Sequence, residues 1–311
     1  MLRAISLFSG CGGSDLGLTS LGVRVTWATD IWQPACDNYS LNMHATEVVC
    51  ADIQNIKHFP SAEVMIGCYP CQGFSQAGRR DPTDDINQLF RHFGRALRRV
   101  KPLGFIVENV VGMTFGHNRE LLHQQLALFR WSGYDVHWRL LDARDYGLAQ
   151  ERKRVFIVGT RKDLRLQYAY PKPTHQPGGR RPWTAQRVAL KGFPLWPEGD
   201  YDPQPLSWYY MSRRRRRDWD ETAPCVVSHS RSVALHPVSP SMRFVGPDEY
   251  QFITKGPARR YSYLECAALQ GFPRSFRWVD GSLPLKYRLV GNAVPPPLMK
   301  AVAAPLVRLL T

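Results

Sequence analysis

Short apolar runs alternate with amphipathic stretches along the first half of the chain. Residues 3–8, RAISLF, predict a buried strand that leads into a GCGG turn. Ser14 and Asp15 follow the turn and predict the cap of a helix running to about Leu21. A second strand, VRVTWAT, ends at Asp30. The chain therefore begins with a strand, a helix and a strand.

The same alternation continues to about residue 160. VMIG predicts a strand, residues 87–100 predict an amphipathic helix, and LGFIV predicts a strand ending at Glu108. A helix near 119–130 and strands around VHWRLL and VFIVG follow. Strands that alternate with helices are typical of a parallel α/β sheet, so we predict a Rossmann-like α/β fold.

The periodicity is lost after Thr160. Residues 161–257 form short segments broken by proline, which predicts an irregular, β-containing second domain. Helical character returns in LECAALQG and PLMKAVAAPLVRLL, whose apolar residues can pack against the first sheet. We therefore expect a catalytic and cofactor-binding domain at 1–165, a second domain at 166–258, and a return to the first at 259–311.

Positive charge is concentrated in the irregular part. The 311 residues carry a formal net charge of +15, and residues 160–260 contribute 18 basic against 9 acidic side chains, with 13 of the 24 prolines. Such a segment predicts a polyanionic partner, in particular nucleic acid, although a basic solvated surface is the simpler alternative.

Other bulk features narrow the class of protein. The first ten residues reach glycine before a secretory apolar region is completed, and no run approaches the roughly 18 apolar residues of a membrane span. We expect a soluble, cytoplasmic protein. Seven cysteines spread over the chain are unlike a secreted disulfide framework, and they lack the paired spacing of a zinc site, so no metal is expected.

The glycine-rich turn predicts a nucleotide-type ligand. Gly10 and Gly12 lie between a strand and a helix, and glycine lets the backbone approach a ligand closely. Asp30, at the end of the next strand, can accept hydrogen bonds from ribose hydroxyls, and Asp52 can accept one from an adenine amino group. These features leave a dinucleotide and S-adenosylmethionine equally open.

The segment GCYPCQGFSQAG holds Cys68 and Cys71 two residues apart. A dithiol redox pair is one interpretation. The other is a single thiolate that adds to C6 of cytosine, which makes C5 nucleophilic if a protonated carboxyl group near N3 stabilises the ring. Glu108 ends a neighbouring parallel strand and is placed for that role, although an ordinary strand-end acid is the simpler alternative.

Six segments occur in an order that resembles the DNA cytosine-5 methyltransferases: FSGCGGSDLGL, PCQGFS, ENV, QERKRVFIVG, ALQGFP and GNAVP. The resemblance implies that Cys71 is the nucleophile, that Glu108 holds the cytosine edge and that Cys68 is a bystander. It implies further that Arg154 reaches the cytosine O2 and its phosphate, with Gln150 and Arg152 in supporting positions. We therefore expect Cys71, Glu108, Arg152 and Arg154 to form the catalytic group.

The resemblance also implies a cofactor and a substrate. The cofactor is S-adenosylmethionine, and the target cytosine is expected to leave the DNA stack to reach the thiol, with residues 73–85 closing over it. Pro70 and Gln72 would shape the catalytic loop, and Gln72 and Ser75 would contact DNA. The cofactor residues implied are Phe8, Gly10, Gly12, Asp30, Ile31, Asp52, Ile53, Pro70, Leu89, Asn292 and Ala293.

The middle segment would be the target-recognition domain. MSRRRRRDWDETAP and CVVSHSRSVALHP resemble the small HaeIII-type enzymes, which modify GGCC. Alternate residues of an extended strand face one way, so Arg213, Arg215 and Arg217 can address a DNA groove together, with Arg231 nearby, although each could equally contact only phosphate. The resemblance implies a monomer acting on double-stranded DNA in the nucleoid, with a cognate restriction endonuclease that need not bind it.

Some positions depart from the family pattern, and two other functions stay open. Tyr69, Ile86, Tyr261 and Leu264 stand where relatives commonly have other residues. None of them removes a group that the mechanism needs, but the altered motif at 259–273 leaves open how the two domains are braced and hence the exact target. Cytosine-5 methylation of tRNA is the nearest alternative, although the CFT triplet typical of that branch is absent. A dithiol oxidoreductase that uses Cys68 and Cys71 is the other.

Overall fold

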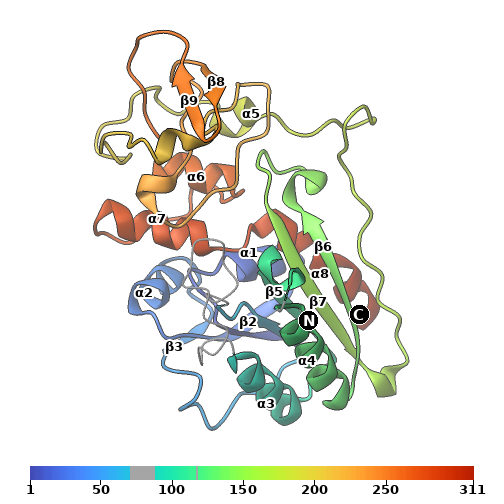
Figure 1. Cartoon of the computed structure of the whole chain (residues 1–311). Helices are drawn as coiled ribbons and strands as arrows, with labels where there is room; N and C mark the ends of the chain where they lie inside the picture. Colours follow the sequence, from blue (N-terminus) through green and yellow to red (C-terminus); the bar gives the residue numbers. More distant parts are fainter. Residues whose placement is uncertain (71–87, 117) are drawn as a thin grey trace. The chain divides into compact units, whose positions relative to one another are not determined.

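The computed structural model describes residues 1–70, 88–116 and 118–311 (Figure 1). By its contacts this part of the chain divides into two compact units. The first unit holds residues 1–142, 153–172 and 294–311, and the second holds 143–152 and 173–293. The predicted functional ranges 1–165, 166–258 and 259–311 stay a prediction.

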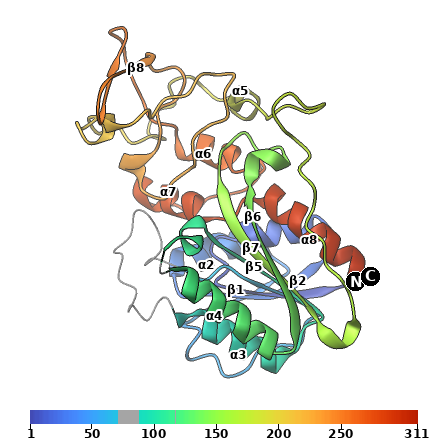
Figure 2. The same cartoon turned by 45° about the vertical axis from the view of Figure 1, so that its right-hand side comes forward.

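A mixed sheet forms the centre of the first unit (Figure 2). Among the described residues it has seven strands in the order β3-β2-β1-β4-β5-β7-β6, and β7 alone runs antiparallel to its two neighbours. The predicted parallel α/β fold is thus confirmed for five strands. The strands are β1 Arg3–Leu7, β2 Arg24–Asp30, β3 Glu47–Cys50, β4 Val64–Gly67, β5 Gly104–Val110, β6 Tyr134–Asp142 and β7 Lys153–Arg161.

Helices cover both faces of the sheet. The strands alternate their side chains, so Ile5 and Phe105 belong to a core shared with the α3 residue Phe93, whereas Gly104 faces Leu306 of α8. Helix α8 also packs on α1, where an added Cβ at Gly17 would lie 2.4 Å from the carbonyl oxygen of Pro296. The helices and 3₁₀ segments of this unit are α1 Gly13–Thr19, α2 Gln33–Asn42, α3 Phe90–Val100, η3 Val111–Thr114, α4 Asn118–Trp131, η5 Lys162–Leu164 and α8 Pro296–Leu310.

The second unit is mostly irregular, as the prolines predicted. It contains one described two-stranded hairpin of β8 and β9 and several short helical segments. Helix α7, whose start at Leu283 carries a proline in its first turn, was not predicted from the sequence. The elements are η4 Ala143–Tyr146, α5 Gln186–Leu190, η6 Tyr210–Ser212, η7 Ser230–Ser232, β8 Met242–Gly246, β9 Glu249–Phe252, α6 Tyr263–Leu269 and α7 Leu283–Asn292.

One stretch of the described chain, Leu283–Leu310, is long and apolar enough to cross a membrane by length and composition. Its most apolar window has a hydropathy of 1.2 and is half buried, and a buried core helix passes the same test. The stretch comprises two helices, because α7 ends at Asn292 and α8 begins at Pro296.

Candidate active site and cofactor pocket

The glycine loop joins β1 to α1 through left-handed backbone. Gly10 has φ +54°, and its N–H donates to Oδ2 of Asp30 at 2.9 Å. Gly12, with φ +90°, is the N-cap of α1, and an added Cβ there would meet the ring of Tyr39 at 3.0 Å. Phe8 also has positive φ, at +57°. The loop therefore depends on glycine at positions 10 and 12.

Asp30 ends β2 at the sheet edge where a ligand is expected. Its Oδ1 accepts the N–H of Trp32 at 2.9 Å, while Oδ2 accepts that of Gly10, so both oxygens are oriented by backbone. Ile31, which lies between Asp30 and Trp32 in sequence, has an apolar side chain that is 68% exposed. The fixed carboxylate can accept hydrogen bonds from a ribose, and the exposed apolar side chain can pack on a flat ring. The two side chains therefore fit a ligand that carries both groups.

The loop after β3 supplies a second acid. Asp52 is partly exposed, and its Oδ1 accepts the N–H of Gln54 at 2.9 Å. Ile53 is buried, and its carbonyl accepts from Arg95 of α3. Arg95 was not singled out from the sequence, because its role arises only from tertiary packing. Leu89, at the start of α3, is partly buried.

Strands β1 and β4 lie side by side, with β2 and β5 on their outer sides. The order of the parallel strands reverses at this point, and ligands of open α/β sheets bind at the carboxyl edge of such a switch point. Asp30 is the last residue of β2, and Gly10 and Asp52 lie shortly after the carboxyl ends of β1 and β3. These residues fit an adenosine-bearing cofactor.

Asp15 was predicted to cap α1, and this prediction is wrong. The N-cap is Gly12 with no side-chain cap, and both Ser14 and Asp15 lie within the first turn, because the glycine turn enters the helix earlier than the polar residues suggested. Asp15 is fully buried, and burial raises its pKa from about 3.8 to about 6. The hydroxyl of Ser14 donates to its Oδ1 at 3.4 Å.

Cys68 follows β4 and is partly buried. Burial raises the pKa of its thiol well above the usual value, which disfavours the thiolate needed for attack. Its role as a bystander stays a prediction. Pro70 is described and partly exposed. The predicted nucleophile Cys71, the predicted DNA contacts Gln72 and Ser75, the departure Ile86, the predicted closing segment 73–85 and the predicted helix start at residue 87 lie outside the described residues.

Glu108 and Arg154 form an ion pair across β5 and β7. Nε of Arg154 lies 2.9 Å from Oε1 of Glu108, and the two side chains are only 14% and 10% exposed. The antiparallel register pairs Glu108 with Phe156 and Val110 with Arg154, so the two side chains reach each other diagonally. Glu108 lies inside β5, two residues before its end, and not at the strand end as predicted. The pair holds one carboxyl group in a fixed orientation at low exposure.

Tyr69 is a departure from the family pattern with a clear structural role. It is 3% exposed, its hydroxyl donates to Oε1 of Gln125 at 2.7 Å, and its ring meets that of Phe8 edge to face at 5.8 Å. Nδ2 of Asn109, the residue after Glu108, donates to the Tyr69 carbonyl at 3.3 Å. The chain leading to Pro70 is thereby fixed to α4 and β5. Sequence reasoning missed Asn109, although the ENV segment contains it.

Within the second unit, Gln150 and Arg152 brace other segments. Arg152 is 2% exposed and donates to the carbonyls of Val226, Gly291 and Ala293 at 2.9 to 3.0 Å. Gln150 accepts the N–H of Val226 at 2.8 Å and donates to the side chain of Gln270 at 3.0 Å. These contacts fit a supporting position, and a direct catalytic role for Arg152 stays a prediction.

Asn292 and Ala293 end α7 in the second unit. Asn292 is exposed and Ala293 is 7% exposed. Gly291, just before them, packs so closely on the chain at Ser228 that an added Cβ would lie 2.4 Å from its Cα. The roles of Asn292 and Ala293 in the cofactor site stay predictions.

The four predicted DNA-reading arginines differ in their surroundings. Arg213 and Arg231 are exposed. Arg215 donates to the carbonyls of Tyr210 and Ser232, and burial lowers its pKa. Arg217 pairs with Glu151 at 3.1 Å. Residues 213–217 do not belong to a β-strand, and only Arg216 forms an isolated β-bridge. Strand pairing therefore does not form the common arginine face that the alternation predicted.

Together, the sheet, the glycine loop and the acids after β2 and β3 define an α/β protein with a site for an adenosine-bearing cofactor. The family model described as C-5 cytosine-specific DNA methylase matches residues 2–308. The chain belongs to this family. It is a DNA (cytosine-5)-methyltransferase, and S-adenosylmethionine is its methyl donor.

Curated relatives agree with this assignment. The Type II methyltransferase M.BsuRI of Bacillus subtilis is 35% identical over 98% of this chain and 79% of its own length. The Type II methyltransferase M.NgoPII of Neisseria gonorrhoeae is 34% identical over 97% of this chain and 94% of its own length.

Solved structures share the fold. A putative DNA modification methyltransferase encoded within an E. coli prophage has a TM-score of 0.76 at 22% identity, covering 100% of this chain and 99% of its own. The Dnmt2 methyltransferase of S. pombe has a TM-score of 0.69 at 20% identity, covering 98% of this chain and 99% of its own. At these identities the likeness concerns the fold alone.

Proposed function

We propose that the protein methylates C5 of a cytosine in a short duplex DNA site, with GGCC as the target, and thereby protects host DNA from a cognate restriction endonuclease. The observation that carries the chemistry is the buried pair of Glu108 and Arg154. The target rests on the resemblance of residues 211–237 to HaeIII-type enzymes. We further propose that the enzyme acts in the cytoplasm as a monomer and needs no physical contact with the nuclease.

In the proposed reaction the Cys71 thiolate forms a bond to C6 of the flipped-out cytosine. Electron density would move to C5, which would take the methyl group as its bond to the cofactor's sulfonium sulfur breaks and leaves a neutral thioether. Loss of the C5 proton to solvent would then expel the thiolate and restore the ring. Glu108 would stabilise the ring at N3 and at its amino group, and Arg154 would hold that carboxyl group in place. The cofactor supplies an electrophilic methyl group.

Methyl transfer from tritiated cofactor to a duplex with one GGCC site, compared with a scrambled duplex and with tRNA, tests substrate and target together. We expect incorporation in the GGCC duplex alone, and bisulfite sequencing locates the methylated base. Incorporation in tRNA but not in duplex DNA would support the alternative substrate.

The nucleophile is tested by a pair of matched variants. Cys71→Ser should abolish transfer and the trapping of a duplex with 5-fluorocytosine, whereas Cys68→Ser should retain both, because burial raises the pKa of the Cys68 thiol and so disfavours its thiolate. The reverse result, with transfer and trapping lost in Cys68→Ser and kept in Cys71→Ser, would assign the nucleophile to Cys68.

A further inference from the structure

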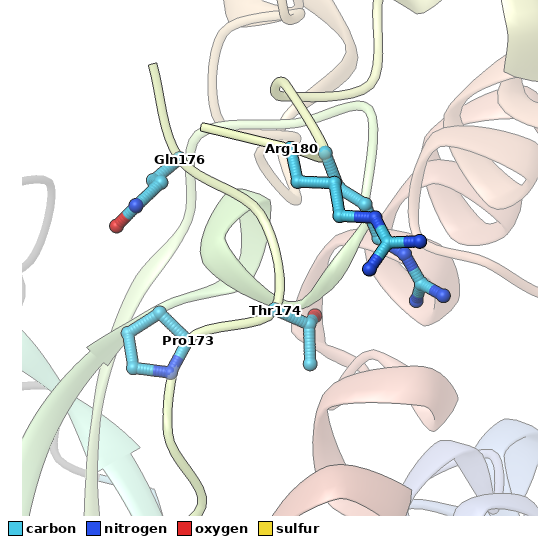
Figure 3. A pocket seen from close by; sticks show the side chains of 5 residues that line it. Pro173, Thr174, Gln176 and Arg180 are labelled. Carbon is cyan, nitrogen blue, oxygen red and sulfur yellow. The ribbon is translucent and has the colours of Figure 1, made fainter. Parts of the chain in front are cut away.

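An open pocket of about 450 Å³ lies in the second unit at residues 173–181 (Figure 3). The guanidinium group of Arg180 lies on the same side of the chain as the Thr174 side chain, and the Gln176 side chain points away from both. In the described part of the chain the lining holds two arginines and no acid. The lining residues are Pro173, Thr174, Gln176, Arg180 and Arg181.

Asp145 of η4 holds this segment at both ends. Its carbonyl accepts the N–H groups of Thr174 and His175 at 2.9 and 3.0 Å. Its Oδ1 accepts the indole N–H of Trp183 at 2.9 Å, and the guanidinium carbon of Arg144 lies 3.8 Å from the centroid of that indole ring. The segment between Thr174 and Trp183 is therefore anchored before and after the two arginines.

A tight turn closes the segment. The N–H of Gln176 donates to the carbonyl of Arg181 at 3.0 Å, and the N–H of Gly179 donates to that of Gln176 at 3.2 Å. Gly178 adopts φ +67°, which favours glycine. The backbone that carries Arg180 and Arg181 is thus ordered by its own hydrogen bonds, so little entropy is lost when a ligand meets it.

Arg180 and Arg181 are exposed, and no carboxylate in the described part of the chain lies against them. Neither Arg180 nor Arg181 makes an ion pair with any residue in the described ranges, whereas Arg187, Arg214 and Arg217 of the same unit pair with acids. Adjacent cations repel, and a shared anion removes this cost. The planar fork of arginine matches phosphate oxygens in particular.

We propose that Arg180 and Arg181 bind a backbone phosphate of the DNA substrate, with Asp145 as the residue that positions their loop. The inference rests on the proposed duplex substrate. The segment 143–152, which holds Asp145, also carries Gln150 and Arg152 and belongs to the same compact unit as the loop. A phosphate contact there adds affinity without reading sequence.

Salt dependence of DNA binding tests this proposal. The dissociation constant of the full-length protein is measured across a salt series for a GGCC duplex and a scrambled duplex. We expect R180A/R181A to reduce the slope of log K against log[salt] by about 0.9, the value for one phosphate, equally for both duplexes. Binding should weaken by roughly three- to tenfold at moderate salt.

A matched control removes the same charge elsewhere. Arg24 and Arg308 are exposed residues of the first unit, and R24A/R308A should keep the wild-type slope. An unchanged slope in R180A/R181A, or an equal loss in both double variants, would overturn the proposal. Thermal unfolding of each variant reports folding. If the alanine variant folds poorly, R180Q/R181Q, which removes both charges but keeps long polar side chains, should lose the same slope, and an unchanged slope in it would overturn the proposal.

Two further measurements complete the test. One distinguishes DNA phosphate from free phosphate, and the other tests the proposed methyltransferase function separately. If inorganic phosphate saturates the arginine pair while R180A/R181A leaves the DNA slope unchanged, the site serves a free anion and the proposal is wrong. Methyl transfer by the wild-type protein is measured separately. A wild-type protein that binds duplexes with the expected slope but methylates none would contradict the proposed function and leave the phosphate site standing.

Discussion

Arg154 and Glu108 are joined by an Nε to Oε1 contact of 2.9 Å across two antiparallel strands. Their strands bring the pair together from positions 46 residues apart in sequence. Because both side chains are largely buried, each depends on the other for compensation of its charge. The pair therefore links the stability of the sheet to the orientation of the group expected to hold the target base.

We expect Glu108→Gln and Arg154→Ala each to lower kcat for methyl transfer by roughly 10² or more, because Glu108 is expected to stabilise the ring and Arg154 to hold the Glu108 carboxyl group in place. If the two act as a unit, the double variant should lose little more than the worse single variant. Single-turnover rates and urea unfolding of all three variants measure this. Fully multiplicative losses would show that the two residues act independently.

Asp30→Ala should weaken S-adenosylmethionine binding about tenfold or more in the absence of DNA, because the carboxylate both fixes the Gly10 loop and faces the expected ribose position. Isothermal titration with the cofactor measures the effect. The control is Asp37→Asn on α2, an exposed acid that accepts a hydrogen bond from Gln33. Equal affinities in the two variants would remove Asp30 from the cofactor site.

Asp15 should make stability depend on pH. Its folded-state pKa of about 6 exceeds the ordinary 3.8, so the native state holds a proton more tightly than the unfolded chain. The free energy of unfolding should therefore fall as pH rises from about 4 to about 6, by up to about 3 kcal/mol. Asp15→Asn should remove this part of the fall, measured by urea unfolding across that range, whereas the exposed Asp135→Asn should not.

Gly17→Ala should disturb the packing of α1 on α8. The added Cβ would lie 2.4 Å from the Pro296 carbonyl oxygen and 2.9 Å from Cβ of Met299, so the helices must move apart. Overpacking costs about 1–3 kcal/mol, partly offset by the better helix propensity of alanine. Gly246→Ala, with open space around it, is the control. Equal unfolding free energies in the two variants would contradict the contact.

Periodicity and strand-end acids predicted much of the first unit, because a sheet buried on both faces leaves a strong apolar signal. Strands β1, β2 and β4 and the placement of Asp30 are confirmed. Contacts between residues distant in sequence were not predictable. From the sequence, Tyr69 was only a departure from the family pattern, yet its buried hydroxyl donates to Gln125 and anchors the chain to α4.

The arginine run shows the limit of local pattern. Alternation predicted a common face for residues 213, 215 and 217, but the side chain of Arg215 bonds to carbonyls of other segments and that of Arg217 to an acid 66 residues earlier. Helix α7 was missed as well, because a proline stands in its first turn and charged residues interrupt its apolar ones.

The ten residues from Ala143 to Arg152 belong to the second unit, although strands of the first unit precede and follow them in the chain. Exchanging sequence specificity between such enzymes by grafting 173–293 alone would therefore leave Gln150 and Arg152 of the host facing foreign carbonyls. A chimera that also carries the short insert keeps those hydrogen bonds among residues that evolved together, which makes two-segment transfer the sounder engineering route.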